Sequence, residues 1–338
     1  MRTVEQLEDQ LSKPTELVVE GLRRLEGDIL LLGVGGKIGP SLARMARRAS
    51  DLAGVSRRVI GISRFSATGE REMLERHGVE TIRCDLLDED ALNALPNAPN
   101  VVFMAGMKFG ATGQEARTWA VNTYLPALVC RKYRHSRMVA YSTGTVYGVA
   151  VVANGGSSES DEPCPVGEYA MSCLGRERMI EHFSRALGFP AALIRLNYAC
   201  ELRYGVLVDI ACKVWAGETI DLAMGHFNII WQGDANAMIL RAFDHVARPP
   251  SIINLTGPEI LTVREVALDF GRRMNRQVKY SGVENPMAIL SNAARAHQLF
   301  GRPAVRADQL IGWIADWISR GGPTLGKPTH FEVRDGKF

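Results

Sequence analysis

Short apolar runs alternate along the first two thirds of the chain with longer segments whose apolar residues recur at helical spacing. The clearest run is Ile29 to Leu32, four apolar residues in a row, which suits a strand buried on both faces. Similar runs predict further strands at 58–62, 79–83, 100–104, 138–142 and 191–196. The longest helices are predicted between them, at about 114–133 and 168–187. This alternation predicts an α/β fold with a doubly wound parallel sheet.

The segments outside this alternation predict two further units. Apolar residues from Leu17 to Leu25 share one face of a covering helix that begins near Ser12. Beyond residue 205 the pattern loosens into short strands and helices, with a late strand of the main sheet expected at 251–255. Further elements are expected at 206–215, 219–222, 227–231, 234–246, 262–275 and 307–319. We therefore predict an N-terminal helical extension at 1–27, a main α/β domain at 28–197, and 198–338 as mostly a smaller C-terminal lobe with parts returning to the sheet.

A glycine-rich turn follows the first strand. Gly33, Gly36 and Gly39 have the spacing G-x-x-G-x-x-G, and Pro40 occupies the first turn of the next helix. Glycines permit positive φ and let a pyrophosphate approach the backbone, while the helix N-terminus offers free N–H groups. Strand, turn and helix together predict the dinucleotide site of a Rossmann fold; a turn without a ligand is the alternative. The residues expected to contact the cofactor here are Gly33, Gly35, Gly36, Lys37, Ile38 and Gly39.

Residues after the next three strands bear on the choice of cofactor. Arg64 follows the second strand, where an acidic residue usually suits NAD and a cation suits the 2′-phosphate of NADP. NADP is therefore predicted, with NAD as the alternative if Arg64 is merely an exposed arginine. Asp85, beside Leu86, can accept a hydrogen bond from adenine or cap the next helix. Lys108 lies where the pyrophosphate would pass, or is a solvated loop lysine.

Composition excludes several classes of function. The 338 residues are 46% hydrophobic and 23% charged, which is ordinary for a globular protein. The net charge of +3 is too small and scattered to indicate a nucleic-acid partner, and no apolar run is long enough for a membrane partner. The N-terminus lacks the apolar core of a signal peptide, so a cytoplasmic location is expected. Six cysteines without CxxC spacing predict neither a metal site nor a disulfide framework.

Several short motifs recur near the predicted strand ends. They are Gly33-x-x-Gly36-x-x-Gly39, Asp85-Leu86, Ala105-Gly106-Met107-Lys108, Asn122, Ser142-Thr143-Gly144-Thr145-Val146-Tyr147-Gly148, Glu162-Pro163 before Tyr169, Arg195-Leu196-Asn197, Gln232-Gly233-Asp234 and Asn254-Leu255-Thr256-Gly257. Spread over about residues 28–320, they jointly resemble the extended short-chain dehydrogenases/reductases, in the NAD-dependent epimerase/dehydratase family. The Met107-Lys108 segment is most similar to UDP-galactose 4-epimerase-like members.

The resemblance implies roles for individual residues. Tyr169 would transfer the proton, with Thr143 as the second hydroxyl on the substrate. Substrate contacts would also include Thr145 and Asn197. Implied cofactor contacts beyond the glycine turn are Arg64, Asp85, Leu86, Ala105, Gly106, Lys108, Asn122 and Tyr169. The family also implies a homodimer in which the two long helices pair with their copies.

One departure from the family pattern concerns the catalytic tyrosine. A lysine one helical turn after it normally lowers its pKa, but this chain has Cys173 there. A neutral thiol leaves the tyrosine near its ordinary pKa of ~10, and thus protonated at neutral pH. Arg176 lies on the same helical face, so its charge can substitute in part. A surface arginine beside Glu177 is the preferred interpretation.

A second departure concerns the substrate. Nucleotide-sugar members place a diphosphate-binding arginine where this chain has Phe227, which leaves Arg302 or Arg203 as substitutes. We therefore expect an NAD(P)-dependent oxidoreductase or epimerase that acts on a sugar-like or other small hydroxylated substrate. The alternative is a catalytically silent NADP-binding regulatory protein that signals the cofactor state to a partner.

Overall fold

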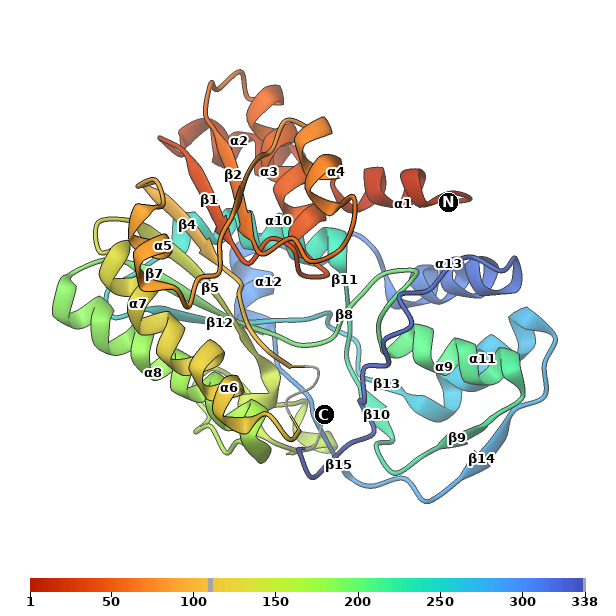
Figure 1. Ribbon diagram of the computed structural model, residues 1–338. Coiled ribbons are helices and arrows are strands. Elements are labelled where there is room, and N and C mark those ends of the chain that lie inside the picture. Colours follow the sequence, from red (N-terminus) through yellow and green to blue (C-terminus); the bar gives the residue numbers. More distant parts are fainter. Residues whose placement is uncertain (109–111, 337–338) are drawn as a thin grey trace.

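Parallel strands in the order β12-β7-β5-β4-β1-β2-β3 form the central sheet of the computed structural model, which describes residues 1–108 and 112–336 (Figure 1). Every neighbouring pair runs in the same direction, so the predicted parallel sheet is confirmed. The strands are β1 (Ile29–Leu32), β2 (Val59–Ser63), β3 (Glu80–Arg83), β4 (Asn100–Phe103), β5 (Arg137–Thr143), β7 (Ala191–Leu196) and β12 (Ser251–Leu255).

Helices cover both faces of this sheet. On β1, Ile29 and Leu31 point into one apolar core and Leu30 and Leu32 into the other, which explains the unbroken apolar run. The first core is shared with α2 (Glu16–Arg24), α3 (Gly39–Leu52), α10 (Gln232–Arg241) and α12 (Ala294–Phe300). The second is shared with α5 (Glu89–Ala94), α7 (Leu125–Lys132) and α8 (Gly167–Leu187).

Helix boundaries depart from the prediction at several places. The helix expected at 114–133 is α6 (Glu115–Trp119), a π turn at Ala120–Tyr124, and then α7. The helix expected at 234–246 ends at Arg241 and continues as a 3₁₀ turn. Sequence periodicity also missed α4 (Glu70–Arg76) and α12, because each spans only two turns and carries few apolar residues.

The smaller lobe has a core of its own. It is formed by α9 (Val206–Ala216), α11 (Val263–Met274) and α13 (Ala307–Ser319). Thr262 caps α11, since the Glu265 amide donates to its Oγ1. The strand expected at 227–231 is two strands in separate small sheets, β10 and β11. The short strands are β6 (Ala150–Val151), β8 (Ala199–Cys200), β9 (Thr219–Asp221), β10 (His226–Phe227), β11 (Ile230–Trp231), β13 (Leu261–Thr262), β14 (Lys279–Ser281) and β15 (Met287–Ala288).

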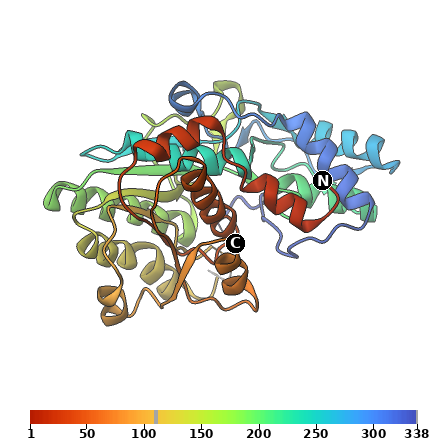
Figure 2. The ribbon, with the colours of Figure 1, turned by 90° about the horizontal axis from the view of Figure 1, so that it is seen from above.

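The two ends of the chain join the lobe to the sheet. Helix α1 (Val4–Leu11) packs into the lobe core, whereas α2 begins after Thr15 rather than Ser12 and packs on the sheet side (Figure 2). After α13 the chain runs back past β10 and β13 toward α6 and β15 (Figure 1). Among the described helices, none combines the length and apolar character that a membrane crossing requires.

Candidate active site

Two cavities meet at the carboxyl ends of the sheet strands. The larger, about 520 Å³, contains the glycine turn and the ends of β2 and β3, and we call it the glycine-turn cavity. The second, about 260 Å³, lies between the ends of β5 and β7 and the lobe, and we call it the Tyr169 cavity. Met104, Gly106, Met107 and Lys108 line both. The segment after β4 therefore joins the two spaces into one site.

The glycine turn has the geometry of a dinucleotide cradle. Gly33 has φ of 93°, which a residue with a side chain rarely adopts. A side chain at Gly39 would collide with the carbonyl oxygen of Val34, so this glycine lets α3 pack against the turn. At Gly36 the nearest atom to a Cβ would be 3.6 Å away, and the missing side chain leaves space inside the cavity. The turn thus fits a pyrophosphate held against backbone N–H groups.

Charged side chains surround the far end of the glycine-turn cavity. Arg64 is exposed and lines it, together with Asp85. The cap of α5 is Asp88, which accepts from the Ala91 amide, so the capping alternative for Asp85 is wrong. Glu70, at the start of α4, was not predicted; a Cβ on Gly35 would lie within 3.2 Å of its carboxylate oxygens. Glu70 does not line the cavity, whereas Arg64 does.

The hydroxyl pair is assembled in the Tyr169 cavity. Thr143 ends β5, Tyr169 lies in the first turn of α8, and their side chains are hydrogen-bonded. Tyr169 is also hydrogen-bonded to the Cys173 thiol. Burial raises the pKa of Tyr169 well above 10, and Cys173 raises it further, while Arg176 and Thr143 oppose the shift. The phenol is therefore protonated at neutral pH.

Arg176 is buried, so its interpretation as a surface residue is wrong. Its guanidinium donates to Tyr141 O at 2.9 Å and to Asn122 Oδ1 at 2.8 Å. It also packs against Gly106, where a Cβ would lie 2.6 Å from Nη2. Arg176 lines the cavity with Tyr169 and bridges the ends of β4 and β5. The chain thus has a fixed cation near Tyr169 although the lysine position holds Cys173.

Asn122 holds the segment after β4 in place. Its Oδ1 accepts from the Met107 amide and its Nδ2 donates to Met107 O, both at 2.9 Å. Nδ2 also donates to Ser172 on α8 at 3.0 Å. The residue is fully buried in the π turn and lines neither cavity. Asn122 therefore acts through protein contacts, and π turns of this kind often mark functional sites.

A buried ion pair fixes the strands that carry the site. Arg195 on β7 donates to both carboxylate oxygens of Glu177 on α8, at 2.9 and 2.6 Å. Glu177 also accepts from Ser142 on β5, and Arg195 donates to the Tyr147 hydroxyl at 2.6 Å. These charge-assisted bonds tie α8 to the ends of β5 and β7, next to Thr143.

Most predicted site residues line one cavity or both. Those in the glycine-turn cavity are Gly33, Gly35, Gly36, Arg64, Asp85, Leu86, Ala105, Gly106 and Lys108. Those in the Tyr169 cavity are Lys37, Ile38, Gly106, Lys108, Thr143, Thr145, Tyr169, Arg176 and Asn197. Gly39, Asn122 and Cys173 line neither and support residues that do.

Several residues that line the Tyr169 cavity were not predicted from the sequence. Tyr204 lies under Lys37, whose Nζ is 3.3 Å from the ring centroid. Thr329 comes from the C-terminal segment, and its carbonyl accepts from Lys108 Nζ at 3.3 Å. Lys108 is half-buried, so the solvated-lysine alternative is wrong. A tail residue 221 positions away carries no local signal that links it to this strand end.

Arg203 and Arg302, the candidate substitutes for the diphosphate-binding arginine, lie outside the two cavities. Phe227 is fully buried and packs on Phe331, with ring centroids 6.0 Å apart. Arg203 pairs with Glu8 and Glu201, and Arg302 is exposed; neither lines the two cavities.

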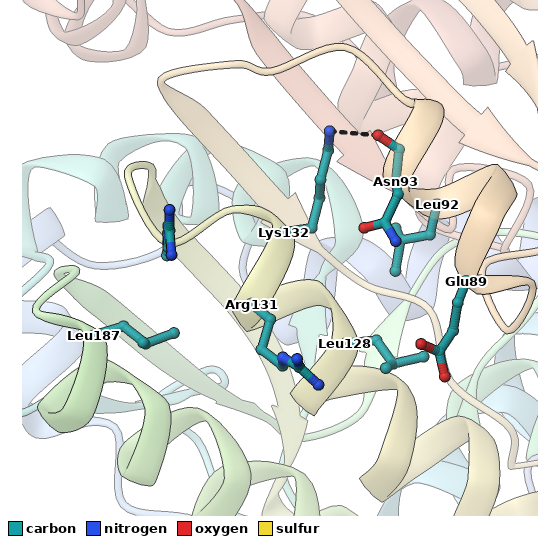
Figure 3. A pocket seen from close by; sticks show the side chains of 8 residues that line it. Glu89, Leu92, Asn93, Leu128, Arg131, Lys132 and Leu187 are labelled. Carbon is teal, nitrogen blue, oxygen red and sulfur yellow. Dashed lines mark hydrogen bonds between the residues drawn. The ribbon is translucent and has the colours of Figure 1, made fainter.

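A third cavity, of about 300 Å³, lies between α5, α7 and the end of α8 (Figure 3). Lys132 donates across it to the carbonyl oxygen of Asn93 at 2.8 Å, and Arg131 and Glu89 face the same space. It shares no lining residue with the other two cavities. It is therefore not part of the candidate active site.

A Rossmann sheet with a glycine-rich turn and a threonine–tyrosine pair is typical of dehydrogenase-like proteins that bind a nucleotide cofactor. The chain belongs to the NAD-dependent epimerase/dehydratase family, whose model matches residues 29–200. No curated protein matches the sequence significantly.

Solved structures share the fold at low sequence identity. UDP-glucose 4-epimerase from Thermotoga maritima, solved with UDP-glucose, is 16% identical with a TM-score of 0.70, covering 87% of this chain and 99% of its own. UDP-glucuronic acid 4-epimerase from Bacillus cereus, solved with UDP-glucuronic acid and NAD, is also 16% identical, with a TM-score of 0.69 and coverage of 87% and 99%. An epimerase described as putative, from Burkholderia cenocepacia, is 17% identical with a TM-score of 0.68, covering 88% of this chain and 100% of its own.

Proposed function

We propose that the protein is an NADP-dependent oxidoreductase or epimerase acting on a hydroxyl-bearing carbon of a small polar substrate. The cofactor supplies hydride transfer when bound. The observation that carries the proposal is the hydrogen-bonded pair of Thr143 and Tyr169. This pair and the buried Arg176 line a cavity that shares residues with the cavity of the glycine turn.

The phenol of Tyr169 is suited to donate a proton. Because its pKa lies well above 10, Tyr169 is an acid at neutral pH and can protonate a substrate carbonyl oxygen as it becomes a hydroxyl. Thr143 holds the same oxygen, and Asn197 lines the wall of the same cavity. The guanidinium of Arg176 stabilises the phenolate left behind, which is the role the family's lysine has. We infer that oxidation, which needs the phenolate as base, is the slower direction at neutral pH.

Support for NADP comes from the lining of the glycine-turn cavity. Arg64 reaches it from the end of β2, and Arg117 and Lys108 add two further cations. Glu70, the acidic residue near the turn, does not line this cavity. A guanidinium suits a 2′-phosphate by bidentate hydrogen bonds.

Turnover of Tyr169→Phe tests the proposal. With NADPH or NADP and a panel of sugars and sugar acids, we expect the wild type to turn over at least one compound. The variant should lose about 100-fold or more in kcat, the usual contribution of a positioned acid or base. NADPH titration by fluorescence should show that the variant still binds cofactor.

Tyr280→Phe is the matched control, because its hydroxyl donates to the Arg264 carbonyl in the lobe and Tyr280 lines neither cavity. Full activity of Tyr169→Phe would contradict the mechanism. Cofactor binding without turnover on the whole panel would instead favour the silent regulatory protein, since Cys173 replaces the lysine that active members use.

A further inference from the structure

The Tyr169 cavity is lined by cations. Lys37, Lys108 and Arg176 all contribute to its wall, and among the described residues that line it none carries a carboxylate. Arg176 is committed to Asn122 and Tyr141. The two lysines thus give the cavity a positive charge beyond what the proton-transferring group requires.

The side chain of Lys37 points away from the glycine turn that carries its backbone. It lines the Tyr169 cavity and not the glycine-turn cavity, and its ammonium lies 3.3 Å from the centroid of the Tyr204 ring. Tyr204 belongs to the lobe side of the cavity. The charge of Lys37 therefore lies on the side of the site opposite Arg64, away from the cradle proposed for the dinucleotide.

Lys108 lies between the catalytic tyrosine and the C-terminal segment. Its Nζ is 5.9 Å from the centroid of the Tyr169 ring and donates to Thr329 O. Thr329 is held in turn by Asp209, which accepts from its amide at 2.8 Å and from its hydroxyl at 2.6 Å. This neighbouring carboxylate is thus occupied by two hydrogen bonds and does not line the cavity.

The two lysines repel each other. The pKa of Lys37 is lowered to about 7, first by burial and then by the charges of Lys108 and Lys327, while Asp209 opposes the shift. Burial also lowers the pKa of Lys108 to about 8, opposed by Cys173 and Asp209. An anion placed between the two ammonium groups would relieve this repulsion and favour their charged forms.

We propose that the substrate carries an anionic group, a carboxylate or a phosphate, which Lys37 and Lys108 bind while Thr143 and Tyr169 hold the reacting oxygen. This rests on the proposed function. The cavity of about 260 Å³, closed on one side by Thr329, fits a molecule the size of one sugar ring. The substrate class is therefore a small hydroxylated acid or sugar phosphate.

Binding of matched probes tests the proposal. D-glucuronate, D-glucose 6-phosphate and D-glucose are titrated into the full-length protein saturated with NADPH, with cofactor fluorescence as readout. We expect at least one anionic probe to bind about tenfold or more tightly than glucose, as a charged hydrogen bond provides. Whichever anion binds better identifies the anionic group. Equal binding of all three probes would overturn the proposal.

Variants of Lys37 test whether this lysine provides the positive charge that binds the anionic group. Lys37→Met should remove the preference for the anion and leave the Kd of NADPH within about twofold. Lys13→Met, at an exposed lysine that lines neither cavity, should change neither. Weaker NADPH binding with an unchanged anion preference would place Lys37 on a cofactor phosphate and overturn the proposal.

The pH dependence provides a second measurement should Lys37→Met not fold. Glucuronate stays ionised above about pH 5, so its affinity for the wild type should fall as pH rises through about 7, where Lys37 loses its proton. In Lys37→Arg the fall should move to about pH 8, where Lys108 titrates. Identical profiles would contradict the assignment. If NADPH itself fails to bind, the proposed function fails, and thermal shift by glucuronate without cofactor still tests Lys37.

Discussion

At the scale of single residues, we propose that Arg176 takes the place of the family's lysine from a different turn of the same helix. The position one turn after Tyr169 holds Cys173, a buried thiol that shares a hydrogen bond with the phenol. The next turn supplies Arg176, which donates to Tyr141 on β5 and to Asn122 in the π turn. Arg176 opposes the rise in the pKa of Tyr169, which is the direction of shift that a cation near a phenol produces.

Arg176→Gln should lower turnover at least about tenfold, which corresponds to ~1.4 kcal/mol of lost transition-state stabilisation. The variant leaves the Tyr169 phenolate without its nearby guanidinium, so the alkaline limb of the pH–rate profile should move to higher pH. Adding Cys173→Lys should move that limb back, and Cys173→Met in the same background should not. Thermal melting separates this effect from loss of folding. Unchanged profiles in all three variants would show that Arg176 has only a structural role.

At the scale of elements, the connections after the strands shape the cofactor site. The π turn at Ala120–Tyr124 interrupts the helix between α6 and α7 and directs Asn122 inward, where it fixes the segment after β4. The connection from β2 to α4 presents Arg64 to the glycine-turn cavity and Glu70 to the back of the glycine turn. We therefore expect cofactor choice to depend on two charges of opposite sign, Arg64 after β2 and Glu70 at the start of α4.

Cofactor titrations test this connection. We expect NADPH to bind more tightly than NADH, and Arg64→Ala to weaken NADPH by about tenfold while leaving NADH nearly unchanged, because only the 2′-phosphate meets the guanidinium. Glu70→Gln should strengthen NADPH slightly by removing a nearby negative charge. Arg71→Ala, on the exposed side of α4, is the control. Tighter binding of NADH by the wild type would defeat the prediction.

At the scale of the whole molecule, three large side chains are exposed on neighbouring helices outside the site. Helices α6, α7 and α8 pack side by side (Figure 1) and, with the π turn between α6 and α7, expose Trp119, Tyr124 and Met171, with 37, 50 and 45% of each residue accessible. Large apolar side chains gathered on neighbouring helices are typical of an interface between subunits. A two-fold axis through these helices would bury these side chains against their own copies.

We therefore predict a homodimer built on α6, α7 and α8. Light scattering at micromolar concentration should return about twice the chain mass of 37.1 kDa. Met171→Glu should shift the protein toward the monomer, because a carboxylate would be buried opposite its own copy. Leu268→Glu, at a similarly exposed site on α11, should leave the mass unchanged. A monomer mass for the wild type would rule out the interface.

Local sequence pattern determined the order of strands and helices, the glycine turn, and the presence of Thr143 and Tyr169 at strand and helix ends. It could do so because burial on both faces requires unbroken apolar runs, and positive φ requires glycine. Only the tertiary structure decided that Arg176 is buried, that Asn122 acts through the protein, and that Thr329 closes the cavity. Arg176 contacts Asn122 across 54 positions of the chain, and Thr329 contacts Lys108 across 221. Contacts over such distances leave no periodic pattern in the sequence. Distant segments come together only when the strands align in the sheet and the C-terminal segment folds back over it.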